Sequence, residues 1–431
     1  MDSIIRLSPD QLVALVQEAG LRTGELLQDL KDEQLIVRRC ETVNPFLWEI
    51  GHVAFFYELF LLRELDGVEP LIEGCDDLFD SFTVDHDDRW GLPLPCRERS
   101  LEYAEVVRKM VCDRLADRSK DGSETYHYLL ATRHEDMHAE AFTFMRQTLE
   151  YAQPKLSVPR APAASGGSLP GDVDFAGGRL QLGARPESGF VFDNEKWAHA
   201  VDVKPFSMAR AAVTNAEFAE FISAGGYRRQ ELWSRQGWQW RVREGAQHPI
   251  YWRKGEHGWL RQHFDTFVSL EENHPACNLT WYEADAFCRW AERRLPTEAE
   301  WEMAATHSRD ASEPKSTFPW GEGPAGAERV NMDWANMGCV DVGAYAPGDT
   351  ADGVRQMIGN VWEWTASDFY PFPGYVVDQP YKQYSAPWFG YRKVLRGGCW
   401  ATRSRLISAT YRNFFPPERN DVFAGFRTCA L

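Results

Sequence analysis

The sequence lacks the features of several protein classes. Its nine cysteines are scattered and odd in number, with no Cys-x-x-Cys pair, so we expect free thiols in a reducing compartment. No apolar run reaches membrane-spanning length, and the N-terminus does not read as a signal peptide. Basic residues are too few for a nucleic-acid or anionic-membrane partner, because the net charge is −17. These absences predict a soluble cytoplasmic protein.

The chain has enough apolar material for a large core, since 44% of its 431 residues are hydrophobic. This length predicts two or three domains. Helical periodicity predicts four helices in the first part, residues 1–153, and four antiparallel helices form a bundle. The expected helices cover residues 8–33, 43–65, 98–117 and 122–151. Residues 154–172 are rich in proline and glycine, which predicts a linker.

The remainder, residues 173–431, has a different composition. All but two of the 17 tryptophans lie after residue 190, and short apolar runs are broken by glycine, proline and asparagine. Two helices are still expected, over 213–225 and 281–294, each with a capping-type threonine at or just before its start. We therefore predict a second domain that is α+β, rich in loops and held together by aromatic packing.

Three histidines carry the clearest chemical signal. His134 and His138 are four residues apart, which puts both imidazoles on one face of a helix. His52 lies in a strongly apolar segment, where burial is costly unless the imidazole is satisfied. Three neutral imidazoles could bind zinc with an open fourth position, or ferrous iron with open positions for oxygen and a thiolate or selenolate. His127, on the same helix face, is a rival third ligand, and spacing alone does not choose the metal.

Both parts of the chain contain motifs of known families. The second half contains, in order, AVTNAEFAEFI, NLTWYEADAFCRWAERRLPTEAEWEMAA, FPWGE, GNVWEWT, VLRGGCWAT and AGFR. Together these resemble the formylglycine-generating-enzyme-type domain, a fold related to C-type lectins. The first half, with WEIGHVAFFYE and RHEDMHAEAF, resembles the DinB-like four-helix bundle. The fused pair resembles the iron-dependent synthases of ergothioneine and ovothiol biosynthesis, over nearly the whole chain.

This resemblance implies a specific chemistry. The related enzymes hold Fe(II) with three histidines, which correspond to His52, His134 and His138. They use O2 to join a chalcogen to an imidazole carbon of a histidine derivative, most often the trimethylated betaine hercynine. The expected partners are therefore small molecules: hercynine, O2 and a chalcogen donor. His127 is then expected to have a structural role.

Three departures from the family pattern concern the substrates. The relatives place a glutamine just before the last ligand, where this chain has Met137, which we expect to line the substrate site. They carry Trp-Asp after an Arg-Asn pair, where this chain has Phe414 and Phe415. They also place arginines for the donor carboxylates in the loop 76–99, which here has seven acids and three arginines.

The acidic loop bears on the identity of the donor. Acids would repel a carboxylated donor but can accept hydrogen bonds from the hydroxyls of a sugar. The run resembles the selenoneine synthases, which join a selenosugar to hercynine, and we expect Asp85 and Arg89 to contact the donor. Two alternatives stay open. The acids could simply form a solvated loop, or the chain could be an ergothioneine sulfoxide synthase that uses cysteine or γ-glutamylcysteine.

The C-terminal part supplies candidates for binding and catalysis. Hercynine carries a trimethylammonium group, which an aromatic cage can hold. By its place in the family motif, Asn413 is the expected partner of the imidazole or betaine, with Phe414 and Phe415 as the wall. Tyr381 matches the position of the family's catalytic tyrosine, which can supply a proton or an electron, and Tyr375 is the second candidate.

Two other function classes were weighed. A copper-dependent oxidase of the formylglycine-generating type would need a cysteine pair near the Arg-Gly-Gly motif, but only Cys399 lies between Gly398 and Arg412. A non-catalytic reading, with a lectin-like binding domain and a zinc-stabilised bundle, would need a closed metal site. Metal analysis distinguishes these classes.

Overall fold

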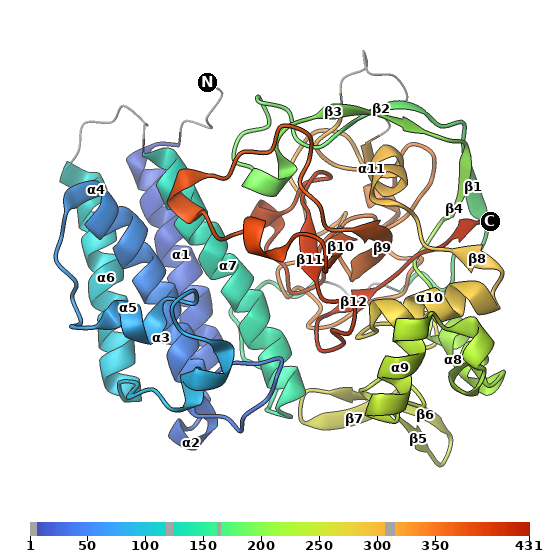
Figure 1. Cartoon of the computed structure of the whole chain (residues 1–431), viewed down its shortest axis with the longest axis horizontal. Coiled ribbons are helices and arrows are strands. Elements are labelled where there is room, and N and C mark those ends of the chain that lie inside the picture. Colours follow the sequence, from blue (N-terminus) through green and yellow to red (C-terminus); the bar gives the residue numbers. More distant parts are fainter. Residues whose placement is uncertain (1–6, 118–123, 162–164, 307–314) are drawn as a thin grey trace. The chain divides into compact units, whose positions relative to one another are not determined.

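The chain forms two compact units in the computed structural model (Figure 1). The first consists of Met1–Ser157 with Gln379–Gln383, and the second of Val158–Asp378 with Tyr384–Leu431. The residues described are 7–117, 124–161, 165–306 and 315–431. Three parts of the predictions lie outside them: the N-terminal residues 1–6, the start of the fourth helix at 122–123, and the middle of the linker at 162–164.

Four long helices build the first unit (Figure 1). They are α1 (Pro9–Leu27), α3 (Phe46–Tyr57), α6 (Arg97–Asp117) and α7 (Thr125–Thr148). The helices α1 and α3 each pack against both α6 and α7. This arrangement confirms the predicted helical bundle.

The ends and faces of these helices follow from their sequences. Ser8 caps α1 through a capping box with Gln11, and a proline occupies the first turn, where its missing N–H costs nothing. Every residue of α3 is buried, as its almost wholly apolar sequence requires. The helix continues as a π-helical turn, η1 (Glu58–Arg63), a rare element that is often found beside functional sites.

Short helical elements complete the first unit. They are α2 (Asp32–Leu35), α4 (Glu64–Asp66), α5 (Cys75–Phe79), η2 (His86–Trp90) and η7 (Gln379–Tyr381). Of these, α5 and η2 lie in the acid-rich loop. The η7 turn comes from the C-terminal part of the chain, which returns to the bundle there.

The second unit contains four small sheets. Two have four strands, in the orders β1-β4-β13-β8 and β11-β10-β9-β12, and the others are the pair β2-β3 and the meander β5-β6-β7. The bounds are β1 Asp172–Phe175, β2 Gly178–Leu182, β3 His199–Val203, β4 Phe206–Ala209, β5 Trp252–Gly255, β6 Gly258–His263, β7 Thr266–Ser269, β8 Arg293–Arg294, β9 Trp362–Asp368, β10 Lys393–Arg396, β11 Asn413–Phe415, β12 Ala424–Gly425 and β13 Cys429–Ala430.

Helices and helical turns join these sheets. The helices are α8 (Asn215–Ser223), α9 (Arg235–Glu244), α10 (Trp281–Trp290) and α11 (Glu298–Thr306). The turns are η3 (Asp193–Glu195), η4 (Gly226–Arg228), η5 (Gln230–Leu232), η6 (Ala346–Gly348), η8 (Ala386–Trp388) and η9 (Ser404–Leu406). Capping boxes at Thr214 and Thr280 begin α8 and α10, as the sequence predicted. Helices mixed with small sheets confirm the predicted α+β character of this part.

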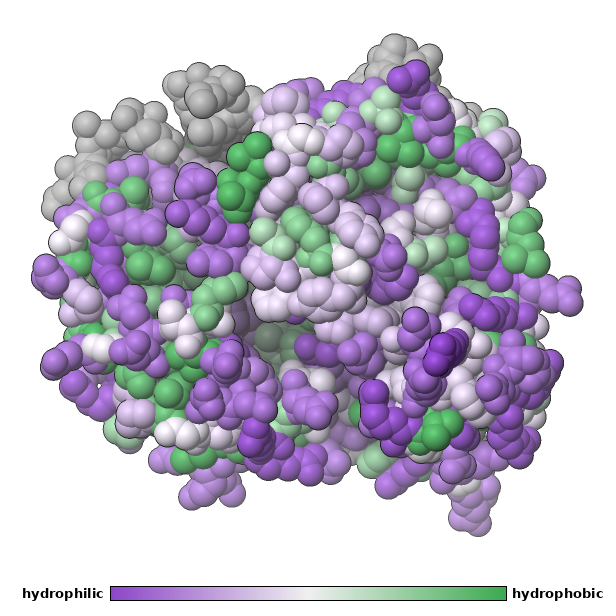
Figure 2. All heavy atoms as spheres, in the orientation of Figure 1, coloured by the Kyte–Doolittle hydropathy of each residue, from purple (hydrophilic) through white to green (hydrophobic). Residues whose placement is uncertain are grey.

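The visible face of the molecule is mainly hydrophilic, with apolar side chains in scattered patches (Figure 2). Within the described part of the chain, no helix combines the length and the apolar character that crossing a membrane would require. Many large apolar side chains are buried in the interiors of the two units, such as Trp48 in the bundle and Trp301 in the second unit.

Candidate metal centre

The bundle brings the three predicted histidines together. His52 comes from α3, and His134 and His138 come from α7. One nitrogen of each lies within 4.8 Å of the corresponding nitrogens of the other two. Among the described residues, this is the group of side chains that has the spacing of a metal site.

Local structure explains how the rings converge. The i, i+4 spacing on α7 places His134 and His138 on one face of the helix, with tilted rings whose centroids are 4.4 Å apart. The ring of His52 meets both edge-on from α3, at centroid distances of 5.0 Å and 4.9 Å. Two adjacent helices of the bundle therefore supply all three imidazoles, a common way to build a metal site in a helical bundle.

Hydrogen bonds orient two of the three rings. His138 donates its Nδ1 proton to Oε2 of Glu49 at 2.5 Å, and His52 donates its Nδ1 proton to the backbone oxygen of Phe79 at 2.7 Å. A neutral imidazole that donates from Nδ1 presents a lone pair at Nε2. These contacts are the outer-shell hydrogen bonds that usually fix metal-binding histidines.

The spacing of the nitrogens suits a cation. Nε2 of His134 lies 3.1 Å from Nε2 of His138. Two nitrogens bound at roughly 2.1 Å and roughly at right angles are about 3 Å apart, so one metal ion could bind both. His134 differs from the others because its Nδ1 is buried without a hydrogen-bond partner, and Phe56 stacks on its ring at 3.7 Å.

Burial favours the neutral form of His52 and His134. It lowers the pKa of His52 to about 3, and lowers the pKa of His134 well below its ordinary value. Burial alone would raise the pKa of the Glu49 carboxyl, but the neighbouring His138 outweighs it, and the pKa falls to about 2. The group therefore has two buried neutral imidazoles and one ionised carboxylate behind His138, which suits a divalent cation.

Tyr381 lies beside this group. It sits in the returning segment of the first unit, with its ring 5.8 Å from that of His134 and 4.9 Å from that of Phe56. Tyr375, the second candidate, belongs to the other unit, where its hydroxyl donates to Asp193 at 2.5 Å. The structure therefore brings Tyr381 together with the histidines within the first unit.

Two other residues of α7, Met137 and His127, are candidates from the sequence. Met137 precedes His138 and is half-buried. His127 is outside the group of converging nitrogens, and its ring contacts that of Tyr126 edge-on at 6.0 Å. Burial lowers the pKa of His127, which is typical of a packed histidine.

The acid-rich loop packs against α3 through α5. Asp85 is exposed at the start of η2, whereas Arg89 is buried at its end. The acids on either side have partners: Asp76 receives both arms of Arg63, and Asp87 pairs with Arg39 at 2.6 Å. Asp85 is therefore better exposed to a ligand than Arg89, whose guanidinium packs on the face of Trp48 at 3.7 Å.

The three expected substrate residues of the second unit form β11. Phe414 is buried and stacks on Phe369 at 4.0 Å, in a cluster with Val394. Alternation along a strand turns Asn413 and Phe415 to the opposite face. Asn413 is partly buried, and its side-chain oxygen accepts a hydrogen bond from the Phe414 N–H at 2.8 Å. Asn413 and Phe415 thus share a face, and Phe414 packs in the core.

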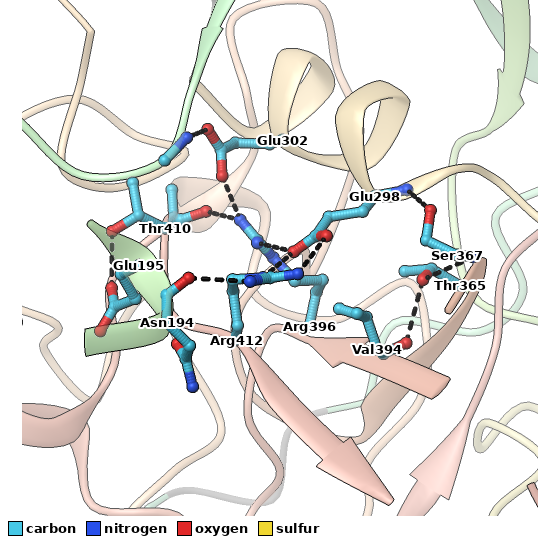
Figure 3. Close-up of polar contacts among 12 residues, drawn as sticks. Asn194, Glu195, Glu298, Glu302, Thr365, Ser367, Val394, Arg396, Thr410 and Arg412 are labelled. Atoms are coloured by element: carbon cyan, nitrogen blue, oxygen red, sulfur yellow. Dashed lines mark hydrogen bonds and ion pairs between the residues drawn. The ribbon is translucent and has the colours of Figure 1, made fainter. Parts of the chain in front are cut away.

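A buried ionic network anchors β11 (Figure 3). Arg412, just before the strand, binds both oxygens of Glu298, at 2.7 Å and 3.0 Å. Arg396 of β10 binds the same carboxylate at 2.8 Å and Glu302 at 2.5 Å. Arg412 also donates to the backbone oxygen of Asn194. Paired and hydrogen-bonded in this way, the buried charges fix the backbone from which Asn413 projects.

Sequence reasoning missed the residues that support the histidines. Glu49 was detectable, because it precedes His52 by one helical turn in WEIGH, the Glu-x-x-His spacing of many bundle metal sites. Trp48 stacks on His52 at 4.7 Å and is the residue directly before Glu49. Phe79 contributes only a backbone oxygen, for which the sequence contains no signal.

Comparisons with known proteins agree with this architecture. Residues 158–430 match the sulfatase-modifying factor enzyme 1-like domain, and residues 16–144 match the DinB superfamily. Hercynine oxygenase of Mycobacterium tuberculosis is 35% identical, over 97% of this chain and 98% of its own. Hercynine oxygenase of Mycolicibacterium thermoresistibile is 34% identical, over 97% and 94%. Formylglycine-generating enzyme of Streptomyces coelicolor is 29% identical, over 64% of this chain and 94% of its own.

A DinB-type bundle with a three-histidine group, followed by a sulfatase-modifying factor domain, defines the class of protein. The chain belongs to the family of the hercynine oxygenases, which it matches over nearly its whole length. The family and the order of the two folds are those that the sequence motifs predicted.

Proposed function

We propose that this protein is an Fe(II)- and O2-dependent enzyme that joins selenium, or sulfur, to the imidazole carbon of hercynine. The observation that carries the proposal is the convergence of His52, His134 and His138 beside Tyr381. The near full-length relatives named hercynine oxygenases support both the substrate and the use of oxygen.

The donor set is compatible with iron. Imidazoles bind iron, zinc and copper alike, so the ligands alone do not select the metal. Zinc has no redox chemistry, whereas iron(II) can give electrons to O2 and is held by imidazoles in non-haem oxygenases. Iron(II), when bound, would supply the electrons for oxygen activation. His52, His134 and His138 would hold it, and Glu49 would keep His138 oriented and electron-rich.

The overall reaction balances with one molecule of O2. The chalcogen–hydrogen bond and the imidazole C–H bond break, and a carbon–chalcogen bond and a chalcogen–oxygen bond form. The second oxygen atom leaves as water, which uses the full oxidising capacity of O2. A proton is needed near the metal for that water, and the Tyr381 hydroxyl is the candidate donor, because its ring lies against the ring of His134.

Hercynine has two groups that the protein would have to bind, a trimethylammonium group and an imidazole. Its trimethylammonium group has a permanent charge that aromatic faces attract by roughly 0.5 to 2 kcal/mol for each contact. The half-buried Phe415 and Asn413 share one face of β11 and are our candidates for the betaine and the imidazole. We expect hercynine to bind about tenfold or more tightly than histidine, which calorimetry with the two ligands would measure.

The donor is proposed from the loop around Asp85. This exposed acid has other acids nearby and can accept a hydrogen bond from a sugar hydroxyl, whereas Arg89 is buried. A selenol is also more acidic than a thiol, so it would reach the metal as an anion. We therefore favour a selenosugar over cysteine or γ-glutamylcysteine.

A competition assay tests the proposal. Iron-loaded protein is given hercynine, oxygen and equal amounts of a selenosugar, a thiosugar, cysteine and γ-glutamylcysteine, and the products are identified by mass. We expect the selenium adduct of hercynine to form fastest. A faster reaction of cysteine or γ-glutamylcysteine would instead make the chain an ergothioneine sulfoxide synthase, and no adduct with any donor would refute the coupling reaction itself.

A further inference from the structure

Arg89 contacts two residues, Trp48 and Asn44, that connect it to two of the three histidines. Its side chain is 9% exposed, although it follows the exposed and acidic start of η2. Its guanidinium stacks on Trp48, and its Nη1 donates to Oδ1 of Asn44 at 2.8 Å. A third contact, from Nη2 to the backbone oxygen of Val84 at 3.3 Å, fixes the plane of the group.

The first connection runs through stacked rings. The indole of Trp48 and the imidazole of His52 are nearly parallel, with an interplanar angle of 11° and centroids 4.7 Å apart. The indole N–H donates to the backbone oxygen of Leu78 at 2.8 Å, so the ring cannot rotate without losing that bond. Arg89, packed on the indole, therefore helps to set the plane of the His52 ring.

The second connection runs through hydrogen bonds. Asn44 receives its bond from Arg89 at Oδ1 and donates from Nδ2 to Oε1 of Glu49 at 2.5 Å. The other oxygen of Glu49 accepts the Nδ1 proton of His138. The Arg89 contact fixes which end of the Asn44 amide faces Glu49, because a guanidinium can only donate.

We propose that Arg89 is a positioning residue of the metal centre, holding His52 through Trp48 and His138 through Asn44 and Glu49. The proposal rests on the proposed function only in requiring a metal at the three histidines. A planar guanidinium can stack on an indole and donate in fixed directions at the same time, which a lysine cannot do. A donor carboxylate would have to displace buried contacts to reach this group.

The test is a metal titration that does not depend on catalysis. Co(II) is titrated into the metal-free full-length protein, and its affinity and visible absorption spectrum are recorded for the wild type and for Arg89→Met. Methionine keeps much of the aliphatic part of the arginine side chain but lacks the guanidinium group. We expect the affinity for Co(II) to fall by about tenfold to a hundredfold, with an altered spectrum, as for other outer-shell changes at metal sites.

The matched control is Arg114→Met. Arg114 is an equally buried arginine of the same bundle, 7% exposed, and it pairs with Asp66 and Glu124 rather than with the supports of the histidines. Arg114→Met should keep the affinity and the spectrum even if it lowers thermal stability. Equal weakening by both variants would show a general loss of packing and overturn the positioning role.

A second variant covers a failure of Arg89→Met to fold. Asn44→Ala removes one connection and leaves Arg89 and Trp48 in place, so it should weaken Co(II) binding by less than Arg89→Met does. In the Asn44→Ala background, Arg89→Met should lower the Co(II) affinity by a smaller factor than it does in the wild type, because the connection through Asn44 is already broken. Unchanged affinity in Asn44→Ala, with Arg89→Met unfolded, would overturn the proposal.

The remaining outcomes separate this inference from the proposed function. Wild-type protein that does not bind Co(II) would refute the metal centre and the positioning role together. Arg89→Met with unchanged Co(II) binding but a raised KM for the chalcogen donor in the iron-saturated enzyme would make Arg89 a donor ligand. That result would overturn the inference and leave the proposed reaction standing.

Discussion

His138 and Glu49 form a buried pair, in which the imidazole Nδ1 donates to the carboxylate at 2.5 Å. The pair joins α7 to α3 directly behind the converging nitrogens. Because Glu49 is only 3% exposed and its second oxygen accepts from Asn44, the carboxylate is held on both sides. Such a carboxylate raises the basicity of the ligand and fixes its tautomer.

Replacing the Glu49 carboxylate should weaken metal binding without disturbing the packing of the bundle core. We expect Glu49→Gln to lower the affinity for Fe(II) or Co(II) by about tenfold to a hundredfold, since the amide has no charge with which to polarise His138. Glu58→Gln is the control, because Glu58 is also fully buried in the bundle but accepts from Tyr103 and contacts no histidine. Metal titration of both variants checks this prediction. Equal metal affinities of Glu49→Gln and Glu58→Gln would contradict the role of Glu49.

Removing the hydroxyl of Tyr381 should affect the reaction and spare the metal. The ring contacts of Tyr381 with Phe56 and His134 survive in Tyr381→Phe, so the metal affinity should stay unchanged. Loss of a proton donor typically costs about a hundredfold or more in kcat. Single-turnover kinetics would measure this.

The comparison variant is Tyr375→Phe, which loses only the hydrogen bond to Asp193. It should be less stable by about 1 kcal/mol and retain its turnover. If Tyr375→Phe is the slow variant and Tyr381→Phe is not, the catalytic assignment belongs to Tyr375.

The sequence could predict those features of this centre that depend only on residues close together in the chain. It could not predict those that depend on how distant segments pack. The spacing of His134 and His138 is a property of one helix, and the apolar surroundings of His52 lie within one segment, so the sequence contained both. The distance between Glu49 and His138 depends on how α3 packs against α7. The neighbourhood of Tyr381 depends on a segment that crosses from the second unit back to the bundle, which no local pattern encodes.

The candidate wall on β11 shows the same limit. The motif gave the location of Asn413, Phe414 and Phe415 but not which of these side chains face the core. The structure places Phe414 among buried aromatic residues such as Phe369, on the opposite face from the other two. A strand of three residues that ends in two phenylalanines is too short to show the alternation of apolar and polar residues that would reveal which side chains face the core.

The proposed contact of Asp85 with the donor predicts a specific effect of Asp85→Asn. The amide can still accept a hydrogen bond but lacks the charge, so the KM for a selenosugar should rise by roughly tenfold, as expected for a hydrogen bond to a charged group. Changes in kcat and in metal affinity should be small. Asp88→Asn, a neighbouring exposed acid of the same turn, is the control. An equal rise in both variants would indicate only the general charge of the loop.

The buried Glu283 predicts a pH dependence of stability. Burial raises its pKa from 4.5 to about 7, although Tyr227 and Thr280 donate hydrogen bonds to it. Because the folded state keeps a proton that the unfolded state loses, stability should fall as the pH rises from about 4.5 to 7. The full effect is on the order of 3 kcal/mol.

Denaturation of wild type and Glu283→Gln between pH 4.5 and 8 isolates this group. The variant should lack that part of the decline, because glutamine does not ionise. Glu217→Gln is the matched control, since Glu217 completes the same kind of capping box with Thr214 at an exposed position. Parallel curves for the wild type and Glu283→Gln would contradict the expected titration.

The most direct measurement is the iron content and oxygen-dependent consumption of hercynine by the wild type and by His134→Ala. His134 is central to the account, because its ring contacts those of His52, His138 and Tyr381. We predict one Fe(II) per wild-type chain with consumption of hercynine, and neither in a folded His134→Ala protein. Full iron occupancy and activity in His134→Ala would contradict the three-histidine centre.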